Sequence, residues 1–223
     1  MAEEFIVFDT VDTSDEVYDV SGGFRLPDFM YEEIKDVVSR LVKKCNVQNI
    51  PVNVFALAKK LGIRLVKFSD LTEYEMHRLA KFGVTEDTAG FYALAEKNGK
   101  KVSYIYYNDK LELGRVRFTI LHEIGHIVLG HIEQSDLAEA MADFFAKYLI
   151  APPMLVDKIR PIDYMEIKEV FLLTKTCAWN SFDYYQTWKR HHFRVGRYEE
   201  YENRIMDFCT LRVPEPYKKR LAV

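Results

Sequence analysis

Hydrophobic residues recur at helical spacing near the start of the chain. Within residues 28–45 they stand three and four positions apart, at Ile34, Val37, Val38, Leu41 and Val42. A second run begins at Pro51 and ends at Gly62, residue types that often mark the two ends of a helix. The mostly apolar residues 63–68 follow. The pattern predicts two helices and then a strand.

The middle of the chain predicts a hairpin. Two runs rich in aromatic and aliphatic residues, 90–95 and 101–107, flank Lys97-Asn98-Gly99-Lys100. Asn-Gly favours a tight turn because both residues tolerate positive φ. We therefore expect a small antiparallel sheet. The strand around 102–106 is expected either at an exposed edge, where it could pair with an extended peptide, or inside the sheet.

Helical spacing returns from about residue 112 to 131 and again in 136–150, where Pro152 and Pro153 end the pattern. The last third holds three more segments that could be helices, at 165–175, 178–192 and 197–208. We expect a single α+β fold with a core at residues 25–155 and a helical C-terminal part at 156–223 packed on it.

Charge sets the first residues apart from the rest. The chain has a formal net charge of −3, but residues 1–20 contain acidic side chains and no Lys or Arg, so the remainder is net basic. Such a segment could fold back on a basic face or mimic a nucleic acid. We expect residues 1–24 to be a solvated acidic leader instead.

The cysteines and the hydropathy exclude several classes of protein. Cys45, Cys177 and Cys209 are odd in number and form no C-x-x-C motif, so neither a disulfide framework nor a thiolate zinc site is indicated. The N-terminus lacks the basic region of a secretion signal, and no run approaches the ~20 apolar residues of a membrane span. We expect a cytoplasmic protein that does not bind membranes.

The segment FTILHEIGHIVLGH, residues 118–131, contains His-Glu-x-x-His inside an apolar run. On a helix His122 and His126 lie one turn apart on one face, so their imidazoles can converge on one cation. Glu123 lies about 100° round the axis, beside the metal. There it can take a proton from water and return it to the leaving amine of a cleaved peptide. Zinc is the expected metal. The alternative is a buried helix with two hydrogen-bonded histidines.

Four segments resemble the ImmA/IrrE family of zinc metallopeptidases, and the likeness spans roughly residues 28–155. They are residues 117–131, residues 142–153, Pro51–Gly62 and Tyr106-Tyr-Asn-Asp. The resemblance implies a zincin-like α+β fold, in which a small antiparallel sheet packs on the motif helix. It further implies a gluzincin-like zinc endopeptidase of a bacterium or phage that cleaves a regulatory protein, such as a helix-turn-helix repressor.

In that family the two histidines of the motif bind zinc, its glutamate is the catalytic base, and a glutamate on the next helix is the third ligand. His122, His126 and Glu123 match. On the next helix the family pattern resembles Glu-x-Glu-Ala-Asp/Asn-x-Phe-Ala with the second glutamate as ligand, and here Met141 takes that place.

A thioether suits Cu(I) far better than Zn²⁺, so Met141 is a poor substitute for a carboxylate. Glu139 and Asp143 each lie about 200° round the helix from position 141 and would need a local register change to reach the metal. Glu139 has the longer reach and is the candidate third ligand. His131 follows His126 by five residues, and we expect it at the helix end or beside the site, not as a ligand.

Two rival functions compete with the peptidase. One is a pseudo-enzyme that keeps the fold, binds a regulator and has lost catalysis through Met141. The other is a metal-independent, DNA-associated regulator that uses the basic cluster at residues 189–194. No DNA-reading motif accompanies that cluster, so we expect a solvated helix end there and no direct binding of nucleic acid.

Overall fold

The computed structural model of the chain describes residues 6–7, 25–97, 99–133, 135–215 and 217–218. The predicted acidic leader lies outside the described residues except for Ile6 and Val7. The chain divides into two compact units, one made of residues 1–25 and 54–143 and the other of 26–53 and 144–223. This division groups 26–53 with the C-terminal part. The boundaries drawn from the sequence at residues 24 and 155 stay a prediction.

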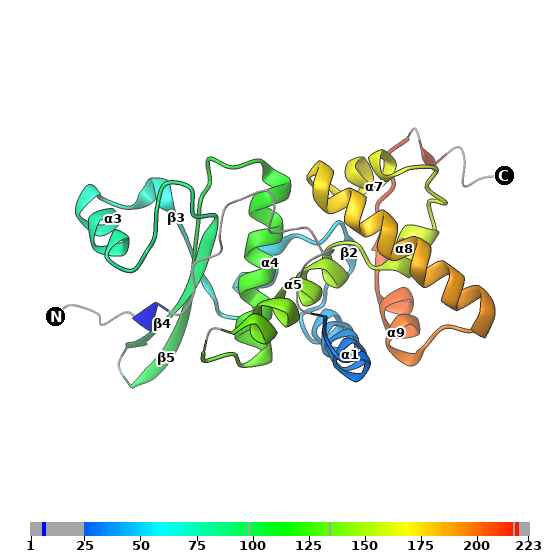
Figure 1. Ribbon diagram of the computed structural model, residues 1–223, viewed down its shortest axis with the longest axis horizontal. Helices are drawn as coiled ribbons and strands as arrows, with labels where there is room; N and C mark the ends of the chain where they lie inside the picture. Colours follow the sequence, from blue (N-terminus) through cyan, green and yellow to red (C-terminus); the bar gives the residue numbers. More distant parts are fainter. Residues whose placement is uncertain (1–5, 8–24, 98, 134, 216, 219–223) are drawn as a thin grey trace. The chain divides into compact units, whose positions relative to one another are not determined.

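The first unit contains a four-stranded sheet in the order β1-β4-β5-β3 (Figure 1). Its strands are β1 (Ile6–Val7), β3 (Arg64–Lys67), β4 (Gly90–Lys97) and β5 (Lys100–Tyr107). The predicted hairpin is confirmed, because β4 pairs antiparallel with β5 in a continuous register from Gly90↔Tyr107 to Lys97↔Lys100. β3 is parallel to β5, and β1 is antiparallel to β4. β5 is therefore an inner strand, and the exposed-edge alternative for residues 102–106 is wrong.

The two faces of the hairpin have different partners, because side chains alternate along a strand. On one face Phe91 stacks on Tyr106 with ring centroids 4.8 Å apart, in a core that includes Phe68 and Val84. On the other face Gly90 lies against α4 (Leu113–Leu129), which carries the His-Glu-x-x-His motif and packs on both β4 and β5 (Figure 1). The hairpin thus fixes the position of the motif helix.

Gly90 allows this close approach. A Cβ atom built there would lie 2.6 Å from the Thr119 side chain and 2.7 Å from the carbonyl oxygen of Tyr106. Since the backbone oxygen cannot turn aside, Gly90→Ala should destabilise the protein by about 1–3 kcal/mol, the usual cost of overpacking. Denaturant unfolding measures this, with Ser103→Ala on the neighbouring strand as control. Equal midpoints for Gly90→Ala and the parent would contradict the packing.

The first unit also holds α2 (Val54–Lys60), the 3₁₀ turn η2 (Phe68–Asp70) and α3 (Glu73–Ala80). Thr72 and Glu75 form a capping box at the start of α3, as the T-x-x-E spacing favours. The next helix, α5 (Asp136–Ile150), begins in the first unit and continues into the second. Its first two turns bring acidic residues to the motif helix.

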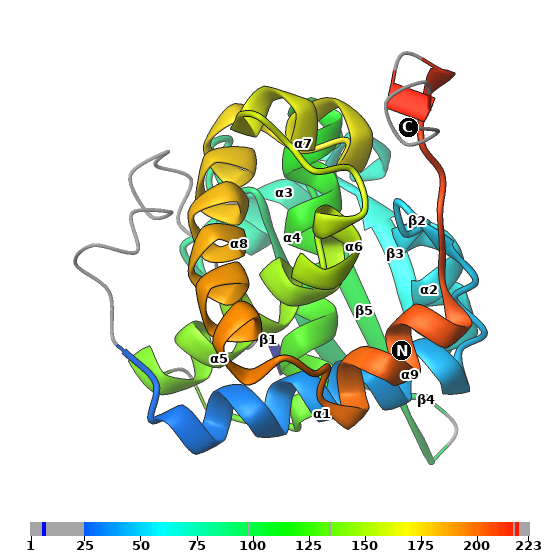
Figure 2. The same ribbon diagram turned by 90° about the vertical axis from the view of Figure 1, so that its right-hand side faces the viewer.

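The second unit is helical, as predicted. It contains α1 (Asp28–Lys44), α6 (Pro153–Asp157), α7 (Tyr164–Phe171), α8 (Lys175–Val195) and α9 (Glu200–Phe208), and the short parallel pair β2 (Asn49–Ile50) and β6 (Thr210–Leu211). α1 and α9 lie side by side (Figure 2), joined by an ion pair between Arg204 and Asp36 at 2.8 Å. This contact between distant segments explains why residues 26–53 belong with the C-terminal part.

The predicted helix at 165–175 ends earlier in the structure, at Phe171 of α7, and the predicted helix at 178–192 lies within α8. Leu172, the residue after α7, has a positive φ of 57°, and the Thr174 side chain caps the start of α8 by accepting a hydrogen bond from the Cys177 backbone. The three cysteines are buried and unbridged. In the described part of the chain no helix is both long and apolar enough to cross a membrane.

Candidate metal centre

The motif helix is apolar on nearly all sides, so its polar side chains lie deep in the protein. His122 is 3% exposed, His126 2% and Glu123 0%. Burial of three ionisable groups on adjacent turns is costly unless they are paired or bind a metal. This helix therefore places three ionisable side chains in the interior of the first unit.

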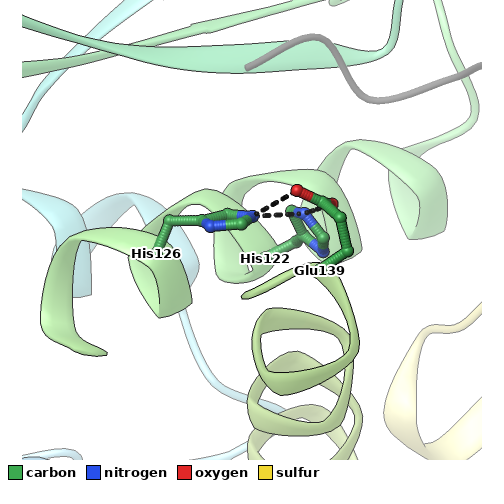
Figure 3. A group of neighbouring side chains, drawn as sticks. All are labelled: His122, His126 and Glu139. Carbon is green, nitrogen blue, oxygen red and sulfur yellow. Dashed lines mark hydrogen bonds and ion pairs between the residues drawn. The ribbon is translucent and has the colours of Figure 1, made fainter. Parts of the chain in front are cut away.

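Glu139 of α5 joins the two histidines. The Nε2 atoms of His122 and His126 are 2.9 Å apart, and carboxylate oxygens of Glu139 lie 3.3 Å from the first and 3.5 Å from the second. Figure 3 shows the three side chains converging from the two helices. The side chain of Glu139 is 31% exposed and those of the histidines are 3% exposed, but the Glu139 oxygen that lies nearest His126 is buried.

Asp143 completes the surroundings of His122. Its carboxylate lies 2.8 Å from Nδ1 of His122, the ring nitrogen that faces away from the cluster. Asp143 follows Glu139 by four residues, so both carboxylates lie on one face of α5 and reach the same imidazole. Asp143 thereby fixes the orientation of the ring and leaves Nε2 for the cluster.

In the structure the side chain that reaches the two histidines from α5 is that of Glu139. Glu139 therefore reaches both histidines without the register change that was expected when position 141 was taken to face the metal. The face toward α4 carries Glu139 and Asp143, one turn apart, and position 141 lies about 200° away from both. The pseudo-enzyme alternative, which was based on Met141 at the ligand position, stays a prediction.

His131 lies at the end of α4, as predicted. Gly130 has a φ of 75° and ends the helix, and the His131 backbone N–H donates to the carbonyl of His126 at 3.0 Å. This turn brings Nδ1 of His131 to 2.9 Å from Nδ1 of His126. His131 therefore contacts the nitrogen of His126 that does not face the cluster.

Tyr92 of β4 contacts both His126 and His131 from the side of the sheet. Its ring stacks on His126, with centroids 5.6 Å apart, and its hydroxyl donates to the carbonyl oxygen of His131 at 2.8 Å. Tyr92 follows Phe91 on the strand, and neighbouring side chains point to opposite faces, so Tyr92 lies on the face of the hairpin that meets α4. The sheet thus fixes both the ring of His126 and the backbone of His131.

The three histidines differ in their affinity for protons. Burial lowers the pKa of His122, but hydrogen bonds with Asp143 and Glu139 raise it by more, so its pKa lies well above the ordinary value. Burial holds the pKa of His126 below its ordinary value. Burial and the nearby His126 lower the pKa of His131 to about 4. Of the three histidines, His122 therefore has the highest affinity for a proton.

The donor set suits zinc. Two imidazole nitrogens and a carboxylate oxygen lie within 4.8 Å of one another. Ligands of a tetrahedral zinc ion, each about 2.0–2.1 Å from the metal, are about 3.3 Å apart, which is close to the separations seen here. The other ring nitrogen of each histidine already has a partner, Asp143 or His131. Three protein ligands would leave a fourth position for water.

Two residues at the site, Asp143 and Tyr92, were not predicted from the sequence. Glu139 and Asp143 form a Glu-x-x-x-Asp pair, whose spacing places both on one face of a helix and could have indicated Asp143. The position of Tyr92 in the alternating pattern of β4 could have indicated that it faces α4, but its contact with His126 depends on how strand and helix pack.

The basic cluster at residues 189–194 is the end of α8. Arg190 donates a hydrogen bond to the Thr187 side chain, and the ring of His192 stacks on Trp188 with centroids 4.9 Å apart. Phe193 is 90% exposed. That the cluster binds no nucleic acid stays a prediction.

Comparison with known proteins identifies one family. Residues 58–158 match the family model Peptidase M78, described as the IrrE N-terminal-like domain. The match includes the motif helix, the hairpin, α5 and α6. Neither the curated proteins nor the solved structures that were compared gave a match.

Proposed function

Because residues 58–158 form an IrrE N-terminal-like domain of the ImmA/IrrE metallopeptidase family, we propose that this protein is a zinc-dependent endopeptidase. The observation that carries the proposal is the meeting of His122, His126 and Glu139 within 4.8 Å, next to the buried Glu123. In this proposal His122, His126 and Glu139 bind the metal. Glu123 is the general base and acid.

Each residue has a separate task in peptide hydrolysis. The metal, when bound, would lower the pKa of a water molecule and polarise the peptide carbonyl. Glu123 accepts a proton from the attacking water and returns it to the leaving amine. Asp143 and Glu139 supply negative charge that offsets the cation. Burial of Glu123 removes competing water from its carboxylate, so that its interaction with the reacting groups is strengthened.

The proposed substrate is a regulatory protein of a bacterium or phage, with a helix-turn-helix repressor as the expected class. Support comes from the family and from the partial exposure of two acidic side chains at the cluster, 31% for Glu139 and 41% for Asp143. A macromolecular substrate can reach the site only from an exposed side. Co-expression with a candidate repressor, followed by mass spectrometry of the fragments, would identify the cleaved bond.

Metal content gives the first test. His122→Ala and His126→Ala should each hold much less zinc than the parent, because each removes an imidazole that no neighbour replaces. His77→Ala on α3, outside the cluster, is the matched control and should keep the parental content. Elemental analysis of the purified proteins measures zinc per chain. Equal zinc in the parent and both variants would place the metal elsewhere and refute the proposed site.

A further inference from the structure

His131 makes a contact that the proposed function does not use. Its Nδ1 lies 2.9 Å from Nδ1 of His126, and the two rings are 5.0 Å apart at an interplanar angle of 73°. At this distance one nitrogen carries a hydrogen and the other accepts it. The direction of this hydrogen bond determines which nitrogen of His126 has a free lone pair.

The surroundings of His126 determine that direction. Its Nε2 faces Nε2 of His122 and a carboxylate oxygen of Glu139, at 2.9 Å and 3.5 Å. A nitrogen that binds a metal must carry a lone pair there, so its hydrogen must be on Nδ1. In that tautomer Nδ1–H of His126 donates, and Nδ1 of His131 accepts.

The backbone around His131 is built to hold this acceptor in place. Gly130 turns the chain at the end of α4, and the His131 N–H donates to the carbonyl of His126 itself. Tyr92 then donates its hydroxyl hydrogen to the His131 carbonyl while its ring stacks on His126. Both ends of the contact are thus held by the same two elements, α4 and β4.

The ring of His131 has one polar contact among the described residues. Its Nε2 is buried and has no hydrogen-bond partner there, so within the described residues the ring forms its hydrogen bond with His126. His122 has an equivalent arrangement, with Asp143 at Nδ1, but that partner is a charged carboxylate. The two histidines are therefore oriented by different chemistry, one anionic and one neutral.

We propose that His131 is a positioning residue, whose Nδ1 accepts the Nδ1 hydrogen of His126 and so keeps Nε2 of His126 unprotonated and directed at the metal. The role rests on the proposed function, since it assumes a metal held by His126. It does not make His131 a ligand, because the His131 nitrogen meets the far side of the His126 ring.

Asparagine and leucine give a matched pair of variants. Oδ1 of asparagine is separated from Cα by the same number of bonds as Nδ1 of histidine and can accept a hydrogen bond, whereas leucine has a similar shape and no acceptor. His131→Leu should weaken zinc binding about 10–100-fold, the usual effect of removing a partner of a metal-binding histidine. His131→Asn should stay within about threefold of the parent.

Zinc affinity would be measured by competition with a chromogenic chelator, and circular dichroism with thermal melts of the metal-free proteins would monitor folding. Equal loss of affinity in both variants would make His131 a ligand or a packing residue. Equal retention would leave it without a role. Either result would overturn the proposal.

Nitrogen-detected NMR of the imidazoles tests the same idea without any variant. In the metal-free parent, His126 should carry its hydrogen on Nδ1, because Nδ1 of His131 lies 2.9 Å away and accepts it. A hydrogen on Nε2 of His126 would refute the proposal. A parent that binds no zinc would refute the proposed function, but the tautomer of His126 would still decide the role of His131.

Discussion

Glu123→Gln should abolish peptide hydrolysis and leave the fold and the bound metal intact. The amide keeps the size and shape of the carboxylate, but it cannot accept a proton from the attacking water. General acid–base groups of this kind contribute about 10²–10⁴-fold to the rate, and we expect a loss in that range. Cleavage of a co-expressed candidate repressor provides the assay.

Glu133→Gln is the control for this experiment, because Glu133 is exposed on the loop after α4 and lies outside the cluster. It should cleave like the parent. Zinc content must be measured on the same samples, so that loss of rate is separated from loss of metal. Undiminished cleavage by a zinc-loaded Glu123→Gln variant would exclude Glu123 as the base.

Glu139→Gln should lower the affinity for zinc by more than about 100-fold. The carboxylate supplies the negative ligand of the cluster, and a neutral amide neither offsets the charge of the cation nor binds zinc well. His122 and His126 keep their contact with each other and their contacts with Asp143 and His131, so the fold should be retained. Competition with a chromogenic chelator measures the affinity, and thermal melts with and without zinc show whether metal still stabilises the protein.

Met141 provides the matched control, since it lies two residues from Glu139 but about 200° away on the helix. Met141→Leu conserves volume and should keep the parental affinity for zinc. Met141→Glu, which would restore the glutamate of the family pattern, should gain nothing. A Met141→Glu variant that binds zinc more tightly than the parent, together with a Glu139→Gln variant that binds normally, would return the third ligand to position 141.

Residues close in sequence determined much of the candidate site. His122, Glu123 and His126 owe their arrangement to the repeat of one helix, so their spacing alone predicts that the two imidazoles share a face. Gly130 ends the helix for an equally local reason, because its positive φ of 75° suits glycine. The hairpin of β4 and β5 likewise follows from two apolar runs around an Asn-Gly turn.

Only the tertiary structure brought a carboxylate, the candidate third ligand, to the two histidines. Helical spacing says that Glu139 and Asp143 share a face of α5, but which face meets α4 depends on how the two helices pack. The same holds for Tyr92, which the alternation of β4 directs to one side of the sheet and only packing brings to His126. Such contacts join separate elements, so no local pattern in the sequence contains them.

The grouping of elements was also a tertiary result. α1 stands near the start of the chain, yet Arg204 of α9 binds its Asp36, and β2 pairs with β6 across most of the sequence. β1 pairs with the outer edge of β4, which periodicity could not show. Amphipathic spacing determines that a helix buries one face, whereas the partner of that face is selected by shape and charge among all segments of the folded chain.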